Sequence, residues 1–368
     1  MPPTSSLPQA IQSLYDDSRA LWLPHRVAEY TTPGSAVPFL RDHVAPSVPC
    51  VWRGAASHWP AVGLWGGHDF AHLRRTVGHK EVDVALTPDG RADAVVHALD
   101  ARGRPFRAFA APQVERQRVS ELLSSLRVGP GAGDEADEAV PYYSAQDSSL
   151  TRELGEVACD VDAGTVRFAE TAFGGAASAT NVWIGDGRSV TTTHADPFEN
   201  VYAVVSGCKT FELRPPCDAA WLPKPRLRNV RWGRESGRWR TREVEGWTEW
   251  VDEEMIDERW GKGVEVEVRA GDLLYLPALW CKLRQKGSGR RGRGCEVLTS
   301  VCGVVLRLCD SPSRAADRGN DGRQLVVRDV VRAGVDPSGA VRKAAAVCDG
   351  GGRCKRLRRR KRRRRGGK

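Results

Sequence analysis

Apolar and polar positions alternate in short runs along most of the first 280 residues, and turn residues separate the runs. "KEVDVALTPDGRADAV" (80–95) alternates Val82, Val84 and Leu86 before a Pro-Asp-Gly turn. "NVYAVVSGCKTFELRPP" reads as two strands about a Ser-Gly turn, and "VEVEVRAGDLLYLPALW" (264–280) as two more about Ala-Gly-Asp. Many short antiparallel strands in this order predict a β-sandwich or barrel.

Helical spacing is found in two places. The first 24 residues form an amphipathic pattern with Ile11, Leu14 and Leu21 on one side, and residues 112–127 show helical spacing through their leucines. Residues 225–262 are charged and rich in tryptophan, which indicates an insertion. It either covers the mouth of a site or is a solvated loop, and its alternating charges favour the loop.

The composition divides the 368-residue chain unequally. Twelve tryptophans, from Trp22 to Trp280, indicate a packed body, whereas residues 281–368 hold twenty arginines and no aromatic residue. We therefore expect an N-terminal helical segment (1–45), a β domain (46–283) and a disordered, arginine-rich tail (284–368), in which 295–308 could still add a strand.

The net charge of +10 belongs to the tail, because its last twenty residues hold twelve Lys/Arg and one Asp, so the body is close to neutral. Such a run is a polyanion-binding or nuclear-import signal, or a solvated end without a role. The first 24 residues lack the basic region and apolar run of a secretory signal, so we expect none, and the sequence has no apolar run long enough to span a membrane. The ten cysteines include no C-x-x-C, which indicates reduced thiols in a cytoplasmic or nuclear protein.

The chemistry centres on "SVTTTHADPFENVYAVV", in which His194 and Asp196 are two residues apart. Residues at that spacing on a strand point to the same face, as two ligands of one metal must. A His/Asp pair with a distant histidine forms the facial triad of non-haem Fe(II) oxygenases. On its own, His-x-Asp is a weak signal.

Several pieces together resemble the Jumonji-C (cupin-like) 2-oxoglutarate oxygenases: "VTTTHADPFENVYAVVSGCKTFELRPP", "AGDLLYLPALW", "PCVWRGAASHWP" and "TPDGRADAV". The last two are similar to the lysyl hydroxylase subgroup. The resemblance covers roughly residues 20–280. It implies a mainly β fold with flanking helices, a double-stranded β-helix (jelly-roll), incomplete at its C-terminal end, with iron at one mouth.

The resemblance also implies roles for individual residues. His194 and Asp196 match two Fe(II) ligands, and Lys209 matches the lysine that pairs with the distal carboxylate of 2-oxoglutarate. Thr191 and Tyr142 match hydroxyl donors to that carboxylate, with Tyr143 as an alternative to Tyr142. A further match is Asn200, which corresponds to an asparagine beside the metal-bound co-substrate.

The third iron ligand is missing, because none of the eight histidines follows His194. Lys282 occupies the expected position, or the histidine is deleted between Cys281 and Lys282. A lysine ammonium repels Fe(II) unless burial deprotonates it, and a thiolate from Cys281 or Cys295, or water, is an alternative. Either the protein is a pseudoenzyme on a retained scaffold, or the reading after Trp280 is a shifted frame or a retained intron; we favour the second account.

Two functions follow as expectations. The first is an Fe(II)- and 2-oxoglutarate-dependent protein hydroxylase, inactive if the missing ligand is essential. Its expected substrate is a lysyl side chain in a GTP-binding protein of the translation-factor class, and a homodimer is a possible state. A protease activity on histone tails, also associated with the subgroup, has less weight. The second function is a non-catalytic cupin-like binding protein whose basic tail contacts nucleic acid.

Overall fold

The computed structural model describes residues 7–66, 69–127, 138–257, 262–284 and 300–310. All of these belong to the first of two compact units, Met1–Asn320. The second unit, and with it most of the predicted tail, lies outside the described residues. No helix in the described part of the chain is long and apolar enough to cross a membrane.

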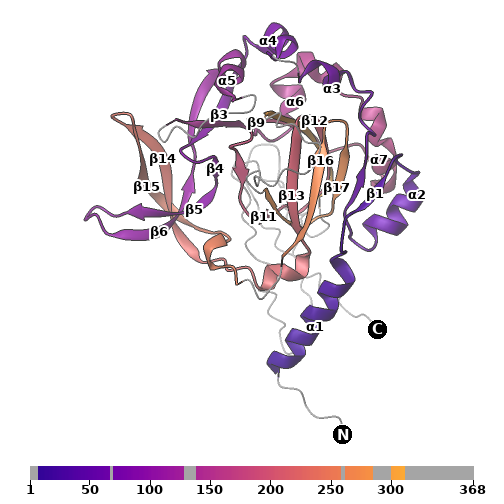
Figure 1. The fold of residues 1–368 in the computed structure, drawn as a ribbon, viewed down its shortest axis with the longest axis horizontal. Helices are drawn as coiled ribbons and strands as arrows, with labels where there is room; N and C mark the ends of the chain where they lie inside the picture. The colour runs from indigo at the N-terminus through magenta and orange to yellow at the C-terminus, as the bar shows by residue number, and fades with distance from the viewer. Residues whose placement is uncertain (1–6, 67–68, 128–137, 258–261, 285–299, 311–368) are drawn as a thin grey trace, which may run out of the picture. The chain divides into compact units, whose positions relative to one another are not determined.

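A nine-stranded sheet, which we call the large sheet, forms the centre of this unit (Figure 1). Its strands lie in the order β1 (Ala28–Tyr30), β2 (Cys50–Trp52), β17 (Leu273–Leu276), β12 (Phe198–Ser206), β19 (Ser300–Asp310), β9 (Ala179–Asp186), β8 (Val140–Tyr143), β3 (Glu81–Thr87) and β7 (Gln113–Arg118). The neighbouring pairs from β17 to β7 are antiparallel.

A four-stranded sheet, the small sheet, has the order β11 (His194–Ala195), β18 (Cys281–Arg284), β13 (Cys208–Arg214) and β16 (Val264–Arg269). It shares one apolar core with the large sheet. Phe211 and Leu213 of β13 pack there with Tyr202 and Val204 of β12. Alternate residues of one strand face the same side, so Lys209 projects inward with Phe211 and Leu213.

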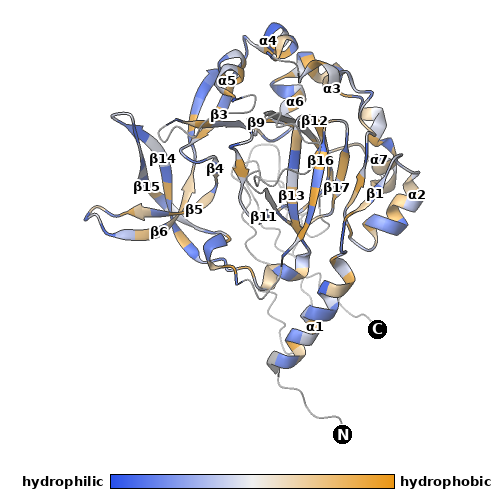
Figure 2. Cartoon of the chain, in the orientation of Figure 1, coloured by the Kyte–Doolittle hydropathy of each residue, from blue (hydrophilic) through white to orange (hydrophobic). Residues whose placement is uncertain are grey.

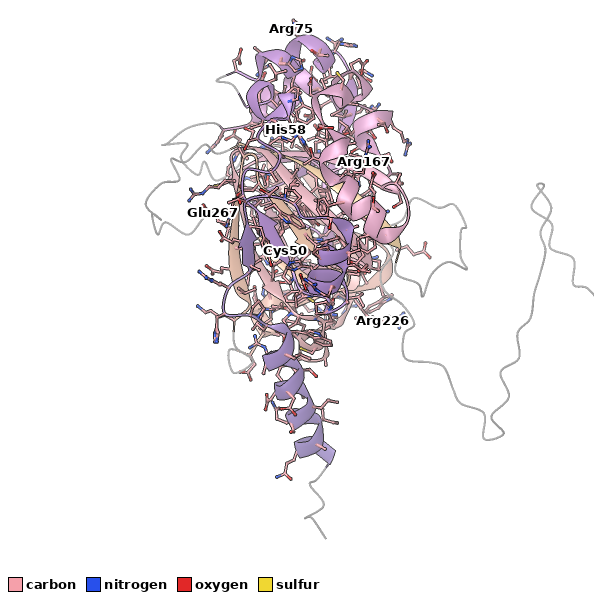
Figure 3. All side chains as sticks on the ribbon, turned by 90° about the vertical axis from the view of Figure 1, so that its right-hand side faces the viewer. Cys50, His58, Arg75, Arg167, Arg226 and Glu267 are labelled. Atoms are coloured by element: carbon pink, nitrogen blue, oxygen red, sulfur yellow. The ribbon has the colours of Figure 1, made fainter. Side chains whose placement is uncertain are left out.

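The large sheet is buried on its other face too. Val201 and Ala203 of β12 point away from the small sheet into a second core built with the helices, so β12 reads as a nearly continuous apolar run. The helices and shorter helical turns are α2 (Ala36–Phe39), η1 (Leu40–Val44), α3 (Pro60–Leu64), α4 (Ala71–Val77), α5 (Val119–Ser125), α6 (Ser149–Arg152), η2 (Gly155–Asp160), η3 (Ala163–Val166) and α7 (Arg167–Phe173). In Figure 3, Cys50 lies among the packed side chains and Arg75 at the outer helix α4.

A third sheet, of order β15 (Arg238–Glu249), β14 (Arg226–Glu235), β6 (Pro105–Ala111) and β5 (Ala94–Leu99), lies to the left of the other two in Figure 1. The remaining elements are β4 (Arg91–Ala92), which pairs with β10 (Val190–Thr191), the turns η4 (Pro216–Ala220) and η5 (Glu253–Met255), and α1 (Leu7–Trp22). The Tyr15 hydroxyl and the Arg19 guanidinium of α1 donate hydrogen bonds to the Asp218 carboxylate in η4.

Two facing, mostly antiparallel sheets with flanking helices are the predicted double-stranded β-helix. The strand considered for 295–308 is present as β19, and it lies between β12 and β9 in the large sheet. The predicted helix over 112–127 is wrong in its first half, where residues alternate in exposure and pair with β3 as β7. Only Val119–Ser125 is helical. The apolar side chains predicted to share a side of α1, Ile11, Leu14 and Leu21, are exposed.

Candidate metal centre

The site is a two-residue ladder at the end of the small sheet. In the antiparallel pairing of β11 with β18, His194 lies opposite Lys282 and Ala195 lies opposite Cys281. Opposite residues in such a ladder share a face. Lys282 therefore projects to the side of His194, while Cys281 turns away with Ala195 into a separate apolar cluster with Leu222.

That arrangement decides between the residues that could replace the missing histidine. Burial raises the pKa of the Cys281 thiol, which keeps it protonated and a poor ligand. The alternative in which Cys281 supplies a thiolate is thus wrong, because its side chain faces away from His194. Cys295 lies outside the described residues. Lys282 is the residue that occupies the third position.

An ion pair fills the centre of the site. The ammonium of Lys282 contacts the Asp196 carboxylate, and the Lys282 side chain is only 3% exposed. His194 Nε2 lies 3.8 Å from the other carboxylate oxygen, Oδ1. His194 and Asp196 therefore converge, as two ligands of one metal would. The cation beside them is the Lys282 ammonium.

The charges of the pair are mutually supported. Burial alone would lower the pKa of Lys282, but the Asp196 carboxylate raises it above its ordinary value. Burial alone would raise the pKa of Asp196, but the Lys282 ammonium holds it well below its usual range. For His194, burial first and the Lys282 ammonium second lower the pKa to about 4. At neutral pH the site holds an ammonium, a carboxylate and a neutral imidazole.

A backbone carbonyl and a neighbouring aromatic ring hold the His194 imidazole in place. His194 Nδ1 lies 2.8 Å from the carbonyl oxygen of Thr192, so Nδ1 carries the proton and Nε2 faces Asp196 with a free lone pair. The Trp250 ring stacks on the imidazole, with centroids 6.2 Å apart, and its Nε1 donates to Thr192 Oγ1 at 3.1 Å. The backbone N–H and hydroxyl of Thr193 donate to Glu253 Oε1.

These supporting residues were not found from the sequence. Trp250 and Glu253 belong to the tryptophan-rich stretch 225–262, for which alternating charges favoured a solvated loop. That interpretation is wrong, because residues 226–249 of the stretch form the hairpin of β14 and β15, and Trp250 packs on His194. The other interpretation of this stretch, a cover for the mouth of the site, agrees with the contact between Trp250 and His194.

The residues predicted to hold 2-oxoglutarate come from several strands. Lys209 is 7% exposed, and its ammonium lies 5.0 Å from the ring centroids of both Trp183 and Phe211. Its charge acts on the pKa of His194, so the two side chains belong to one electrostatic environment. Lys209 and Lys282 also lie 6.0 and 5.4 Å from the Tyr202 ring centroid, which makes Tyr202 a shared wall of the site.

The remaining three predicted residues are less closely grouped. Tyr142 on β8 acts on the pKa of Tyr202 and packs where Gly185 has no side chain; a Cβ there would lie 2.6 Å from Tyr142 Cδ2. Thr191 is on β10, which lies beside β18. Asn200 is buried on β12, and its Nδ2 donates to the carbonyl of Phe198 at 3.1 Å.

Fe(II) does not fit these side chains as they stand. His194 and Asp196 have suitable donors and geometry, but a ferrous ion beside Asp196 would meet the Lys282 ammonium, and two cations in contact repel each other strongly in a buried site. Within the described residues, no group of three His, Cys, Asp or Glu side chains could hold a metal. We therefore derive no reaction step through iron.

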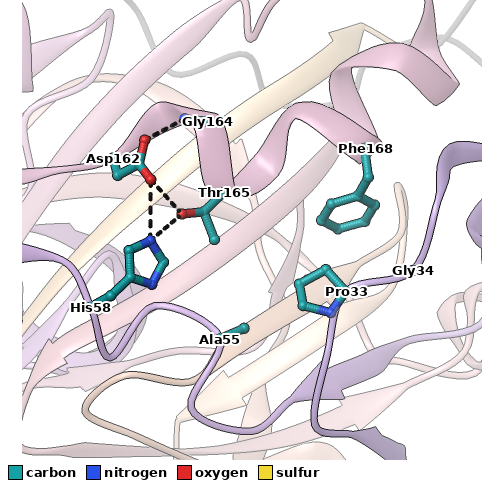
Figure 4. A pocket seen from close by; sticks show the side chains of 8 residues that line it. All are labelled: Pro33, Gly34, Ala55, His58, Asp162, Gly164, Thr165 and Phe168. Atoms are coloured by element: carbon teal, nitrogen blue, oxygen red, sulfur yellow. Dashed lines mark hydrogen bonds and ion pairs between the residues drawn. The ribbon is translucent and has the colours of Figure 1, made fainter.

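A second polar cluster lies on the outer side of the molecule, at the cavity of about 370 Å³ shown in Figure 4. His58 Nε2 is 3.1 Å from Asp162 Oδ2 and 3.0 Å from Thr165 Oγ1. A nucleophile relay needs the two partners on different ring nitrogens. Here both contact Nε2, so the cluster is a polar surface contact.

Comparison with known proteins agrees with this fold. The family model of the cupin-like domain matches residues 36–281. The chain is 33% identical over 291 residues to the human bifunctional peptidase and (3S)-lysyl hydroxylase JMJD7, covering 74% of this chain and 84% of that protein. The chain belongs to the cupin-like Jumonji-C family. The predicted resemblance and fold are confirmed.

Other members of the Jumonji-C family are also similar. The chain is 33% identical over 297 residues to the lysine-specific demethylase JMJ32 of Arabidopsis thaliana, covering 73% of this chain and 80% of that protein. It is 32% identical over 190 residues to the JmjC domain-containing protein E of Dictyostelium discoideum, or 52% of each chain. These relatives support an oxygenase ancestry. The matched cupin-like region ends at residue 281, immediately before Lys282.

Proposed function

We propose that this chain is a binding member of the Jumonji-C family that does not hydroxylate. The Lys282 ammonium on Asp196, opposite His194, carries the proposal. It supplies inside the protein the positive charge that Fe(II) supplies in an iron oxygenase. The scaffold stays intact without metal, and its surfaces remain available to a partner.

The test is metal binding and turnover of the full-length protein. With Mn(II) as a probe, we expect no metal-dependent rise in melting temperature, and with Fe(II) and 2-oxoglutarate no release of succinate. The Lys282→His variant should gain a metal-dependent rise in melting temperature, because a third neutral donor replaces the ammonium. Lys262→His, at an exposed lysine, is the control. Succinate release by the unmodified chain would overturn the proposal.

A second candidate function is hydroxylation of a protein lysyl side chain. The convergence of His194 and Asp196 supports it, together with the lysyl hydroxylase activity named for the human relative. It requires Lys282 to leave Asp196 when Fe(II) and 2-oxoglutarate bind. The experiment above separates the two candidates, because only this one gives succinate without substitution of Lys282.

The arginine-rich end supports one further component of the binding function. Twelve Lys/Arg within the last twenty residues would hold nucleic acid through phosphate contacts alone. Binding should then be independent of base sequence and fall steeply with salt. Equal affinity for an RNA at low and high salt would contradict this role.

A further inference from the structure

The hairpin of β14 and β15 presents an unusual row of charges. Arg238, Arg240 and Arg242 alternate along β15, and Arg231 lies on β14 directly opposite Arg242. All four are exposed. Arg240 lies opposite Gly233, and a Cβ at Gly233 would have no atom within 4 Å, so open space lies above this rung. We call these four residues the arginine face; Figure 2 shows the polar colouring of both strands.

Few carboxylates compensate the positive charge of the arginine face within the described residues. Glu235 is opposite Arg238 and accepts from Arg242 Nε at 2.8 Å. Among the ion pairs of the described residues, Arg231, Arg238 and Arg240 have none. Like charges directly opposite each other in a ladder are destabilising, so Arg231 and Arg242 cost stability unless an anion lies between them.

Protection of an exposed sheet edge explains only part of this arrangement. In the described part of the chain β15 pairs with β14 alone, and charges on an edge strand prevent unwanted pairing. Arg231, however, lies on an interior strand, where it pairs with Ala111 of β6 on one side and with Arg242 on the other. An interior strand needs no such protection.

The two faces of the hairpin differ in chemistry. On the opposite face, Arg228 stacks on Phe106 at 3.7 Å and Arg234 on Trp239 at 5.3 Å, so those cations already have aromatic partners. Among the described residues of the hairpin, the arginine face carries no aromatic side chain at its exposed end, and base stacking is what single-stranded nucleic acids require of a binding surface. Alternate residues of an extended strand are about 6 to 7 Å apart, so the positions of Arg238, Arg240 and Arg242 match the spacing of alternate side chains of an extended peptide.

We propose that the arginine face and the open edge of β15 bind an extended acidic segment of a partner protein. Its alternate carboxylates would pair with Arg238, Arg240 and Arg242, and its backbone would add a strand to β15. The carboxylate opposite Arg242 would also attract Arg231, which lies beside Arg242 on β14. The residue immediately after β15 is Trp250, which stacks on His194, so the bound segment would run toward the site. The proposal is independent of metal binding.

The test uses the full-length protein and a photo-crosslinkable decapeptide of alternating Glu and Thr, measured by fluorescence anisotropy at low salt. The variant Arg231→Gln/Arg240→Gln should bind about fivefold to tenfold more weakly, since each exposed charge pair contributes modestly. The matched control, Arg226→Gln/Arg234→Gln, loses the same charge from the opposite face and should bind like the unmodified protein. Cross-links should map to residues 226–249.

Two further probes sharpen the result. A peptide of alternating Glu and Pro has the same carboxylates but lacks half of the N–H groups, so it should bind more weakly if a strand is added. Oligodeoxythymidine should lose no more affinity in one double variant than in the other. The proposal is overturned by cross-links confined to the basic tail, by equal losses in both double variants, by equal binding of the two peptides, or by a selective loss of oligonucleotide binding.

Discussion

The large and small sheets enclose one core but differ in what they bury. The large sheet buries apolar residues on both faces: in β17, Leu273 and Tyr275 pack under the helices, and Leu274 and Leu276 toward the small sheet. The small sheet buries charge. Lys209, Lys282, Arg214 and Glu212 are all at most 9% exposed, and each lies beside a group of opposite charge or an aromatic ring.

Removing apolar area from water stabilises a fold directly, at roughly 25 cal/mol per Å². A buried ion pair is at best near neutral, because desolvation offsets the attraction between the charges. The large sheet therefore supplies stability, while the small sheet holds a fixed arrangement of charge around His194. The two sheets should respond differently to substitution.

The largest effect is expected from truncation in the large sheet. Leu273 is fully buried on β17, and Leu273→Ala should lower the free energy of unfolding by about 4 kcal/mol through lost burial and a residual cavity. Urea denaturation at neutral pH measures it. The control Leu99→Ala, at a side chain 60% exposed, should cost less than about 0.5 kcal/mol. Similar losses for both would show that β17 is not the core strand described.

A slightly smaller loss of stability is expected in the small sheet, and a second substitution should recover most of it. Asp196→Ala leaves the Lys282 ammonium buried without its carboxylate and should cost about 3 kcal/mol. We place it at the low end because Asp196 is 32% exposed. The double variant Asp196→Leu/Lys282→Met removes both charges and should recover most of the loss, again by urea denaturation. Additive losses would mean that the two charges do not interact.

A dependence on pH should come from the small sheet. The pKa of His194 falls from 6.5 to about 4 on folding, so between those values the unfolded chain binds a proton that the folded chain does not. Stability is then complete above about pH 6.5 and falls as the pH drops toward 4, by about 2 kcal/mol given the 23% exposure of the side chain. His194→Gln should flatten this part of the curve, measured by urea denaturation at several pH values. An unchanged slope in that variant would assign the titration to other groups.

The predictability of the molecule from its sequence follows the same division. Apolar and polar residues alternate along most of strands such as β3 and β16, and glycines at positive φ, such as Gly207 and Gly271, mark turns between strands. Period and turn chemistry therefore predict most of the sheets. The sequence of β7 predicts a helix, because "VERQR" runs without a break into α5. Local spacing cannot report that β3 pairs with it across an intervening β-rich stretch.

The site was predictable in its pieces and not in its contacts. His194, Asp196 and the missing third ligand are visible in the sequence. The register that places Lys282 opposite His194 is a long-range pairing across 88 positions, and it decides that the ammonium, rather than the Cys281 thiol, enters the site. The stacking of Trp250 on His194 likewise depends on where the β14–β15 hairpin ends.

The smallest effect is expected at a polar pair in the large sheet, Tyr275 and Glu199, which includes a half-buried carboxylate as the small sheet does. The Tyr275 hydroxyl donates to Glu199 Oε2 at 2.7 Å, and burial raises the pKa of Glu199. Tyr275→Phe should cost about 1 kcal/mol at neutral pH, because one hydrogen bond to a half-buried carboxylate is lost while the ring still fills its place. Since the carboxyl is less easily charged without the phenol, the cost should shrink as the pH falls through the raised pKa of Glu199. A cost of 3 kcal/mol or more would make this pair as important as Lys282 and Asp196, and would remove the contrast between the two sheets.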